Sequence, residues 1–245
     1  MKIGFFSDPH CGRQELCCGT RRPALSLGKM EKAAEYFRSE GVDLVVCLGD
    51  LINGSGDVDE GGEYLRRAAD VLRNCGIPFY CMIGNHDLYD FDRDFYYKSS
   101  GLEPLPLSVK TDGVTLVFLD ACCLEDGRPY FSDGKKPEWK RAYVADAQIA
   151  ELEKLLSDAD PDEKFWILSH QSLDPLTERS HIIRNAPRIR EILLGAGGKV
   201  KRAICGHYHA GGEDEVDGIK YTVVRGMCNG EDVLPGALLV LDTRE

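Results

Sequence analysis

The 245-residue chain is predicted to adopt an α/β fold whose central β-sheet is largely parallel. Continuous apolar runs bounded by polar turns are typical of strands that are buried on both faces. Segments with the apolar spacing of a helix lie between the early runs, and this alternation indicates helical crossovers between parallel strands. With 43% hydrophobic residues, the chain is large enough to bury the core of a single α/β domain, residues 1–245.

The sequence indicates some of the predicted strands more clearly than others. The strongest apolar runs are residues 2–6, 43–48, 78–83, 114–119, 164–169 and 200–205. Weaker candidates are residues 105–109, 219–224 and 237–241. The strands between residues 213 and 241 have no helix between them, and they are therefore predicted to form a meander.

Amphipathic helices are predicted where apolar residues recur at intervals of three and four. These segments are residues 30–40, 63–75, 146–156 and 188–195. Gly41 and Gly76 follow the first two segments, where helices commonly end. Residues 120–140 are rich in Gly, Pro and charged residues, and we expect them to form an excursion over the surface.

Composition limits the partners of the chain. It has 30 basic and 41 acidic residues, a formal net charge of −11, and no basic block, so we do not expect a general nucleic-acid binder. The opening MKIGFFSD is too short for a signal peptide, and no run approaches the ~18 apolar residues of a membrane span. We expect a cytoplasmic chain without a membrane partner. Its ten cysteines are expected to be reduced thiols, because cytosolic chains rarely keep disulfides, and the lack of a CxxC motif disfavours a zinc-thiolate site. The sequence carries no signal for an oligomeric state.

Polar side chains directly follow five of the strongest predicted strands. In chain order they are Asp8, His10, Asp50, Asn85, His86, Asp87, His170, His207 and His209. The carboxyl ends of parallel strands lie along one sheet edge, where ligands bind, so these groups should meet. A single histidine after a strand is usually a cap or a satisfied core residue. Here all of the 6 histidines except His181 follow strands, which favours a metal site.

The donor types restrict the metal. Imidazole nitrogens with carboxylate and amide oxygens suit Mn, Fe, Zn or Ni, whereas Ca or Mg favours shells made of oxygen alone. Seven candidate ligands, which are Asp8, His10, Asp50, Asn85, His170, His207 and His209, exceed what one ion needs. Two divalent transition-metal ions about 3.5–4 Å apart, sharing one carboxylate, would use all of them.

These motifs resemble those of the calcineurin-like metallophosphoesterase family over nearly the whole chain. The family patterns DxH, GDxx[ND]G, GN[HDE][DE], a lone histidine after a strand and GHxH appear here as DPH at 8–10, GDLING at 49–54, GNHD at 84–87, His170 and GHYH at 206–209. The resemblance implies a four-layer αββα sandwich of two mixed β-sheets flanked by helices. It also implies a hydrolase that cleaves phosphoric esters or anhydrides with two metal ions.

The resemblance assigns a role to each residue of these motifs. The first metal would be held by Asp8, His10 and His209. The second metal would be held by Asn85, His170 and His207, and Asp50 would bridge both ions. His86 resembles the catalytic histidine of the family, a proton donor that does not bind metal, and Asp87 would orient it. Gly49, Gly84 and Gly206 would let the backbone turn sharply beside the ions.

Two stretches resemble a particular branch, the manganese-dependent ADP-ribose/CDP-alcohol diphosphatases. They are LSLGKMEKAAEYFRSEGVDLVVCLGDLING and GHYHAGGEDEVDGIKYTVVRGMCNG, at residues 25–54 and 206–230. This favours manganese and a nucleoside-diphosphate-linked substrate such as ADP-ribose or a CDP-alcohol. Some members of the branch have Gln at the position of His10, and many family members have Asp at the position of Asn53.

Other functions remain open at this stage. A phosphomonoesterase or a cyclic-nucleotide phosphodiesterase would use the same centre with a different pocket. A nuclease would need a basic track, which the composition does not support. A non-catalytic interaction module on this fold would be expected to lose ligand histidines, and none is missing.

Candidate substrate-binding residues are Arg13, Arg22 and Tyr89. Arginine forms bidentate contacts with phosphate, and a tyrosine after GNHD has the shape to stack on a nucleobase. Arg21, Arg93 and Arg184 have the same chemistry. The alternative for the arginines is that they are solvated surface charges, and the alternative for Tyr89 is that it packs in the core. His181 is predicted to lie in a surface loop.

Overall fold

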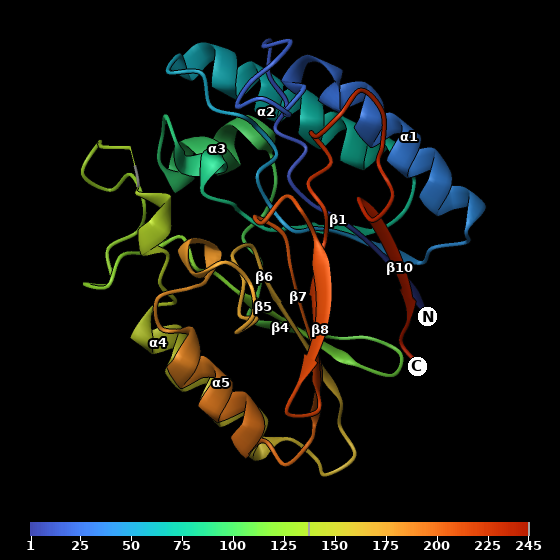
Figure 1. Cartoon of the computed structure of the whole chain (residues 1–245), viewed down its shortest axis with the longest axis vertical. Helices are drawn as coiled ribbons and strands as arrows, with labels where there is room; N and C mark the ends of the chain where they lie inside the picture. Colours follow the sequence, from blue (N-terminus) through green and yellow to red (C-terminus); the bar gives the residue numbers. More distant parts are fainter. Residues whose placement is uncertain (137, 245) are drawn as a thin grey trace.

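The computed structural model describes residues 1–136 and 138–244, so Pro137, which lies within the predicted excursion at 120–140, and Glu245 lie outside the described residues. Its elements form four layers, with two β-sheets packed face to face and helices on both outer sides (Figure 1). The prediction of an αββα sandwich of two mixed sheets is therefore confirmed.

The first sheet has four strands. In spatial order they are β10 (Leu238–Asp242), β1 (Lys2–Phe6), β2 (Leu44–Cys47) and β3 (Phe79–Cys81). The last three are parallel, whereas β10 is antiparallel to β1, so both ends of the described chain meet in this sheet. Its outer side is covered by α1 (Ser26–Ser39), α2 (Val58–Asn74) and α3 (Arg93–Ser100) (Figure 1).

The second sheet has six strands. In spatial order they are β4 (Ser108–Lys110), β5 (Thr115–Leu119), β6 (Phe165–Ser169), β7 (Val200–Cys205), β9 (Ile219–Val223) and β8 (Gly212–Val216). The four inner strands are parallel, and the two edge strands are antiparallel to their neighbours. Its outer side is covered by α4 (Asp146–Asp158) and α5 (Ala186–Gly195).

Three apolar layers explain the continuous apolar runs in the sequence. In β1, Phe5 is buried between the two sheets, whereas Phe6 packs with Phe37 on the helical side. In β6, Ile167 packs on the side of α4 and α5, and Leu168 lies between the sheets. Because both faces of these strands are covered, alternation of polar and apolar residues is lost, as expected for parallel strands under helices.

Three elements differ from the predictions. The predicted meander over residues 213–241 is wrong in its last strand, since β8 and β9 form a hairpin but β10 crosses to the other sheet. Strand β8, with the polar sequence GEDEV, and helix α3 carry little apolar periodicity. The signals for α3 are its caps. The Asp92 carboxylate accepts a hydrogen bond from the Phe95 N–H, and Gly101 ends the helix in the left-handed region.

The strands that carry the polar motifs belong to both sheets rather than to one. β1, β2 and β3 come from the first sheet and β6 and β7 from the second, and the loops at their carboxyl ends meet at one end of the sandwich. All ten cysteines are free in the structure. Within the described parts of the chain, no helix is long and apolar enough to cross a membrane.

Candidate dinuclear metal centre

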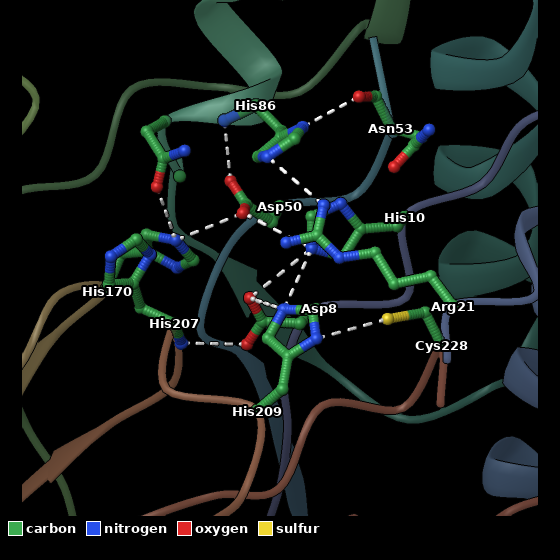
Figure 2. Close-up of polar contacts among 12 residues, drawn as sticks. Asp8, His10, Arg21, Asp50, Asn53, His86, His170, His207, His209 and Cys228 are labelled. Atoms are coloured by element: carbon green, nitrogen blue, oxygen red, sulfur yellow. Dashed lines mark hydrogen bonds and ion pairs between the residues drawn. The ribbon is translucent and has the colours of Figure 1, made fainter. Parts of the chain in front are cut away.

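One group of predicted ligands gathers around the loop after β1. The Nε2 atoms of His10 and His209 lie 3.1 Å apart. Asp8 Oδ1 lies 3.2 Å from His209 Nε2 and 3.6 Å from His10 Nε2. Figure 2 shows these side chains pointing toward one another from loops almost 200 residues apart in sequence. Three donor atoms therefore converge on one small volume.

A second group lies on the side of β6. His170 Nε2 is 3.2 Å from the Asn85 Oδ1 and 3.3 Å from Asp50 Oδ2, and His207 offers a further nitrogen within reach of both Asp50 and His170. Asp50 Oδ2 is also 3.4 Å from His10 Nε2, which belongs to the first group. A single carboxylate oxygen therefore lies between the two groups (Figure 2).

Hydrogen bonds outside the cluster fix the direction of these ligand atoms. The His207 N–H donates to Asp8 Oδ2 (2.8 Å), and the His86 N–H donates to Asp50 Oδ1 (2.7 Å), so the other oxygen of each carboxylate faces inward. The Leu48 carbonyl lies 2.9 Å from His170 Nδ1 and accepts its hydrogen, which leaves the Nε2 lone pair facing the cluster. Such contacts are typical of the groups that orient metal ligands.

Buried side-chain atoms without hydrogen-bond partners give evidence for a metal site that does not depend on a family resemblance. Asp8 Oδ1 and His207 Nε2 are buried, and neither forms a hydrogen bond within the described residues. A buried acceptor without a partner is costly, and two of them directed into a cluster of further donor atoms are explained by bound cations. Two geometric groups, His10–His209–Cys228 and His10–Asp50–His86, add side chains that were not predicted as ligands.

The backbone at the cluster is strained. Asp8, His10, Asp50 and His207 have φ angles of 55°, 49°, 56° and 65°, in the left-handed region that L-residues rarely adopt. Each such residue costs on the order of 1–3 kcal/mol, and it persists only where the surrounding structure enforces it. Four strained residues that all point into one cluster indicate a site selected for function rather than for stability.

Two glycines give the close approach that this geometry needs. A Cβ at Gly84 would lie 2.1 Å from Asp50 Oδ1, and a Cβ at Gly206 would lie 1.8 Å from Ser7 Oγ. Of the three glycines that were predicted to permit sharp turns, only Gly49 has a positive φ, 109°. Space for the neighbouring side chain, and not backbone freedom, therefore explains glycine at residues 84 and 206.

The carboxylates and imidazoles of the cluster shift each other's pKa values. Burial alone would raise the pKa of Asp50, but nearby His170 and His86 reverse this effect and hold the pKa well below its usual value. Burial opposes charge on His170, but Asp50 outweighs it and raises the pKa of the imidazole to about 9. In the same way, Asp8 raises the pKa of His209 to about 10 against the effect of burial. The cluster thus keeps its carboxylates ionised.

The prediction that Asp87 orients His86 is wrong. The Asp87 carboxylate is fully buried and accepts hydrogen bonds from the backbone N–H groups of Asp50, Gly84 and Ile52, at 2.9, 2.8 and 3.2 Å. The His86 ring is held instead by the Asn53 carbonyl, 2.6 Å from Nδ1. Asp87 therefore ties the β2 and β3 loops together, and a backbone carbonyl orients His86.

The predicted substrate-binding residues lie in different surroundings. Arg13 is 73% exposed and pairs with Glu60, and Arg22 lies 3.7 Å from Glu231. Tyr89 stacks on the His86 ring, with an interplanar angle of 8°. Among the described contacts, neither Arg13 nor Arg22 touches a predicted metal ligand, whereas Tyr89 adjoins the cluster through His86.

Sequence reasoning missed several neighbours of the cluster. The Arg21 guanidinium lies 3.3 Å from His86 Nε2 (Figure 2). Asn229 Oδ1 lies 3.3 Å from His209 Nδ1, with Cys228 Sγ at 3.5 Å. His181, predicted to lie in a surface loop away from the site, has its ring 5.1 Å from that of His207. All 6 histidines of the chain therefore gather at this end of the sandwich.

The excursion over residues 120–140 also reaches the site. As predicted, much of its described part is exposed and contains only isolated bridges and a short turn of helix, Trp139–Arg141. However, the Trp139 ring lies 5.3 Å from that of His207, and Lys136 Nζ lies 3.5 Å from the centroid of Tyr89. A segment expected to be a surface loop thus flanks the second ligand group.

Solved structures share this fold at low sequence identity. A dimetal phosphatase from Danio rerio is 21% identical, with a TM-score of 0.76 over 94% of this chain and 88% of that one. A phosphopantetheinyl hydrolase from Mycobacterium tuberculosis is 16% identical, with a TM-score of 0.57 over 98% of this chain and 95% of that one. A purple acid phosphatase from yellow lupin is 16% identical, with a TM-score of 0.59 over 92% of this chain and 44% of that one.

A family model adds the sequence relationship that these structures lack. No curated protein sequence matches the chain. The model of the calcineurin-like phosphoesterases matches residues 1–211, which include every residue of the two ligand groups. The family implies a dinuclear divalent metal centre, in agreement with the two converging groups of donor atoms. The chain belongs to the calcineurin-like phosphoesterase family and is a metal-dependent phosphoester hydrolase.

Proposed function

We propose that the enzyme hydrolyses the phosphodiester or phosphoanhydride bond of nucleoside-diphosphate-linked small molecules, such as ADP-ribose or CDP-alcohols, with manganese as its metal. The observation that carries the hydrolytic part is the position of Asp50 Oδ2, 3.4 Å from His10 Nε2 in one ligand group and 3.3 Å from His170 Nε2 in the other. One carboxylate shared by two sets of donors is the arrangement of a two-metal hydrolase.

The ligand assignment follows the two groups. Asp8, His10 and His209 would hold the first ion, Asn85, His170 and His207 would hold the second, and Asp50 would be shared by both. When bound, the ions lower the pKa of water and neutralise the phosphoryl oxygens as charge develops in the transition state. The protein scaffold holds each ligand from outside, through the backbone N–H groups and carbonyls that hydrogen-bond to Asp8, Asp50 and His170.

His86 is proposed as the proton donor to the leaving group. Its Nδ1 faces the Asn53 carbonyl at 2.6 Å and donates to it, so Nε2 is the atom presented to the cluster. Arg21 occupies the Nε2 side at 3.3 Å, and a guanidinium there disfavours a metal ion on the same nitrogen. Burial and Arg21 lower the pKa of His86 although Asp50 opposes them. An anionic substrate beside Nε2 favours the protonated ring that the reaction needs.

The substrate class is supported by the two stretches that resemble the diphosphatase branch. Residues 25–54 contribute Asp50 and the Asn53 carbonyl, and residues 206–230 contribute His207, His209 and the Asn229 that contacts His209. Both stretches therefore contribute residues to the site rather than to a distant surface. Similarity concentrated there favours a shared reaction.

A single substrate screen tests the proposal. The manganese-loaded protein would be given ADP-ribose, CDP-choline, cyclic AMP, bis-p-nitrophenyl phosphate and p-nitrophenyl phosphate. We expect the two diphosphates to have the highest kcat/KM. A tenfold advantage for p-nitrophenyl phosphate would assign the enzyme to the phosphomonoesterases, and one for cyclic AMP to the cyclic-nucleotide phosphodiesterases. Either result would overturn the substrate class and leave the hydrolytic centre intact.

A further inference from the structure

The position of Arg21 is set by long-range backbone pairing rather than by a helix or strand of its own. The N–H groups of Cys17 and Arg21 each donate to the carbonyl of the other, both at 3.0 Å, and close a tight turn. The Arg22 N–H donates to the Cys228 carbonyl (2.8 Å), and the Gly230 N–H donates to the Thr20 carbonyl (3.1 Å). Residues 20–22 are therefore held on the segment 228–230.

That segment also supports a metal ligand. Asn229 Oδ1 lies 3.3 Å from His209 Nδ1, and Lys29 Nζ donates to the carbonyls of Asn229 and Gly230 from beneath. Lys29 is buried, with 2% of its surface exposed, so this support is part of the folded core. Arg21 and His209 are thus fixed by one piece of backbone, which makes the position of the guanidinium a property of the site.

The guanidinium of Arg21 has no acidic partner. Among the described residues, no carboxylate oxygen lies within 4.0 Å of it, and its side-chain contact is with His86 Nε2. Its neighbours differ, since Arg13 lies 3.3 Å from a carboxylate of Glu60 and Arg22 lies 3.7 Å from one of Glu231. In a chain with a net charge of −11, an unpaired arginine that faces a cation centre indicates an anion that binds between them.

We propose that Arg21 binds the phosphate of the leaving group and thereby makes the enzyme select phosphoanhydrides over simple phosphodiesters. The inference rests on the proposed function, because it places Arg21 on the side where His86 protonates the leaving oxygen. Alcohol leaving groups carry no other charge there, whereas a nucleoside monophosphate or sugar phosphate carries an anionic phosphate. Arginine forms bidentate contacts with such a group, in a geometry that lysine lacks.

The bond changes balance in this reaction. A water oxygen forms a bond to one phosphorus, and the bond from that phosphorus to the bridging oxygen breaks with its electron pair on the oxygen. The departing phosphate takes a proton from His86 Nε2, the attacking water releases one proton to solvent, and solvent returns a proton to His86. Two phosphate monoesters therefore form from one diphosphate and one water. Arg21 stabilises the negative charge that the departing phosphate gains before the proton arrives.

Arg21→Ala and Arg21→Lys test the proposal, with Arg66→Ala, which removes an exposed and ion-paired arginine of α2, as the control. For ADP-ribose we expect Arg21→Ala to lower kcat/KM about ten- to a hundredfold, the range of a hydrogen bond to a charged group. For bis-p-nitrophenyl phosphate, whose leaving group has no phosphate, we expect a loss within about threefold. Arg21→Lys should recover part of the loss, and Arg66→Ala should change kcat/KM for neither substrate by more than about threefold.

A binding measurement separates this role from a general loss of activity. Titration of the manganese-loaded proteins with α,β-methylene ADP, which resists hydrolysis, should show weaker binding to Arg21→Ala at unchanged metal content and unchanged melting temperature. Equal losses on both substrates, or unchanged analogue binding, would overturn the role of Arg21. If the unmodified enzyme hydrolyses no diphosphate, the proposed function itself fails. Activity of the unmodified enzyme and of Arg21→Ala on bis-p-nitrophenyl phosphate would then show that both proteins are active and that the error lies in the substrate class.

Discussion

The centre of the site and its rim are built differently. The centre comprises the seven predicted metal ligands, all of which follow strands and are at most 15% exposed. The rim comprises Arg21, Tyr89, Trp139 and His181, which lie on loops or short helical turns and are only partly buried. The centre is held by two sheets and by strained backbone, whereas the rim depends on loop contacts. We therefore expect the rigid centre to carry the chemistry common to the family and the rim of loops to select the substrate.

The largest effect on metal content and kcat/KM is expected from a substitution at the centre of the site. Asp50→Ala should remove metal from both positions, because Asp50 Oδ2 lies between the two ligand groups. The metals contribute several kcal/mol to the transition state, so we expect kcat/KM to fall by at least about 10³-fold. Metal per chain would be measured by elemental analysis, with the exposed Asp94→Ala as control. Chelation should abolish the activity of the unmodified enzyme and manganese should restore it. Full occupancy of one position in Asp50→Ala would exclude a bridging role.

The next effect lies at the boundary between centre and rim. His86→Ala should retain both metals and lose about 10²–10⁴-fold on a substrate with a poor leaving group, the range typical of proton transfer. Nitrophenolate is stable as an anion, so the loss on a nitrophenyl ester should be much smaller. The ratio of the two losses is the measurement. Equal losses at constant metal content would reduce His86 to an electrostatic contact, and lost metal would make it a ligand, as its proximity to His10 and Asp50 permits.

Asp87 tests the scaffold beneath the centre. Asp87→Ala leaves three buried backbone N–H groups without their acceptor, so we expect the free energy of unfolding to fall by roughly 2–4 kcal/mol. For a chain of this length the melting temperature should fall by roughly 5–15 °C. Asp87→Asn retains an oxygen and should lose less. Because Asp87 does not contact the His86 ring, the ratio of rates on good and poor leaving groups should stay unchanged in the enzyme that remains folded.

The division between centre and rim also separates what could be predicted from the sequence from what could not. Asp8, Asp50 and His170 were predictable because each follows a strand, and a strand end is a local signal. The Asn53 carbonyl that orients His86 was not predictable, since every residue has a carbonyl and side-chain patterns say nothing about its direction. The side-chain rule that a carboxylate orients an imidazole therefore assigned this role to Asp87 by mistake.

The rim and the late strands were missed for a different reason. Arg21 reaches the site only because residues 20–22 pair with residues 228–230, and no local pattern reveals a contact of that range. The crossing of β10 to the first sheet has the same origin, because its partner β1 is at the other end of the chain. Local patterns thus predicted the α/β class and the polar side chains that cluster at strand ends, and the family resemblance predicted the two-sheet sandwich, whereas the parts brought in by distant backbone pairing could not be predicted.

Metal affinity should depend on pH because the ligands hold protons. The pKa of His170 is raised to about 9 by Asp50, and that of His209 to about 10 by Asp8, against burial in both cases. These pairs stabilise the metal-free fold below pH ~6.5, the ordinary pKa of histidine, and the contribution is lost as pH rises through about 9–10. Metal needs the neutral rings, so its affinity should rise over the same range, by up to about tenfold per pH unit for each proton displaced. Calorimetry in buffers of different ionisation enthalpy would detect the released protons, and their absence would contradict the raised pKa values.

The smallest expected effect concerns Arg13, at the outer side of the rim. Its side chain is 73% exposed and its Nε lies 3.3 Å from Glu60, which is only 16% exposed. Exposed ion pairs contribute little, so Arg13→Ala should change kcat/KM for ADP-ribose by less than about twofold. Glu60→Gln releases Arg13 without removing it and should also leave kcat/KM unchanged. If instead Arg13→Ala lowers kcat/KM by tenfold, Arg13 binds substrate as first predicted from its chemistry. Glu60→Gln would then raise kcat/KM, because the competing carboxylate is gone, and the rim would extend to residue 13.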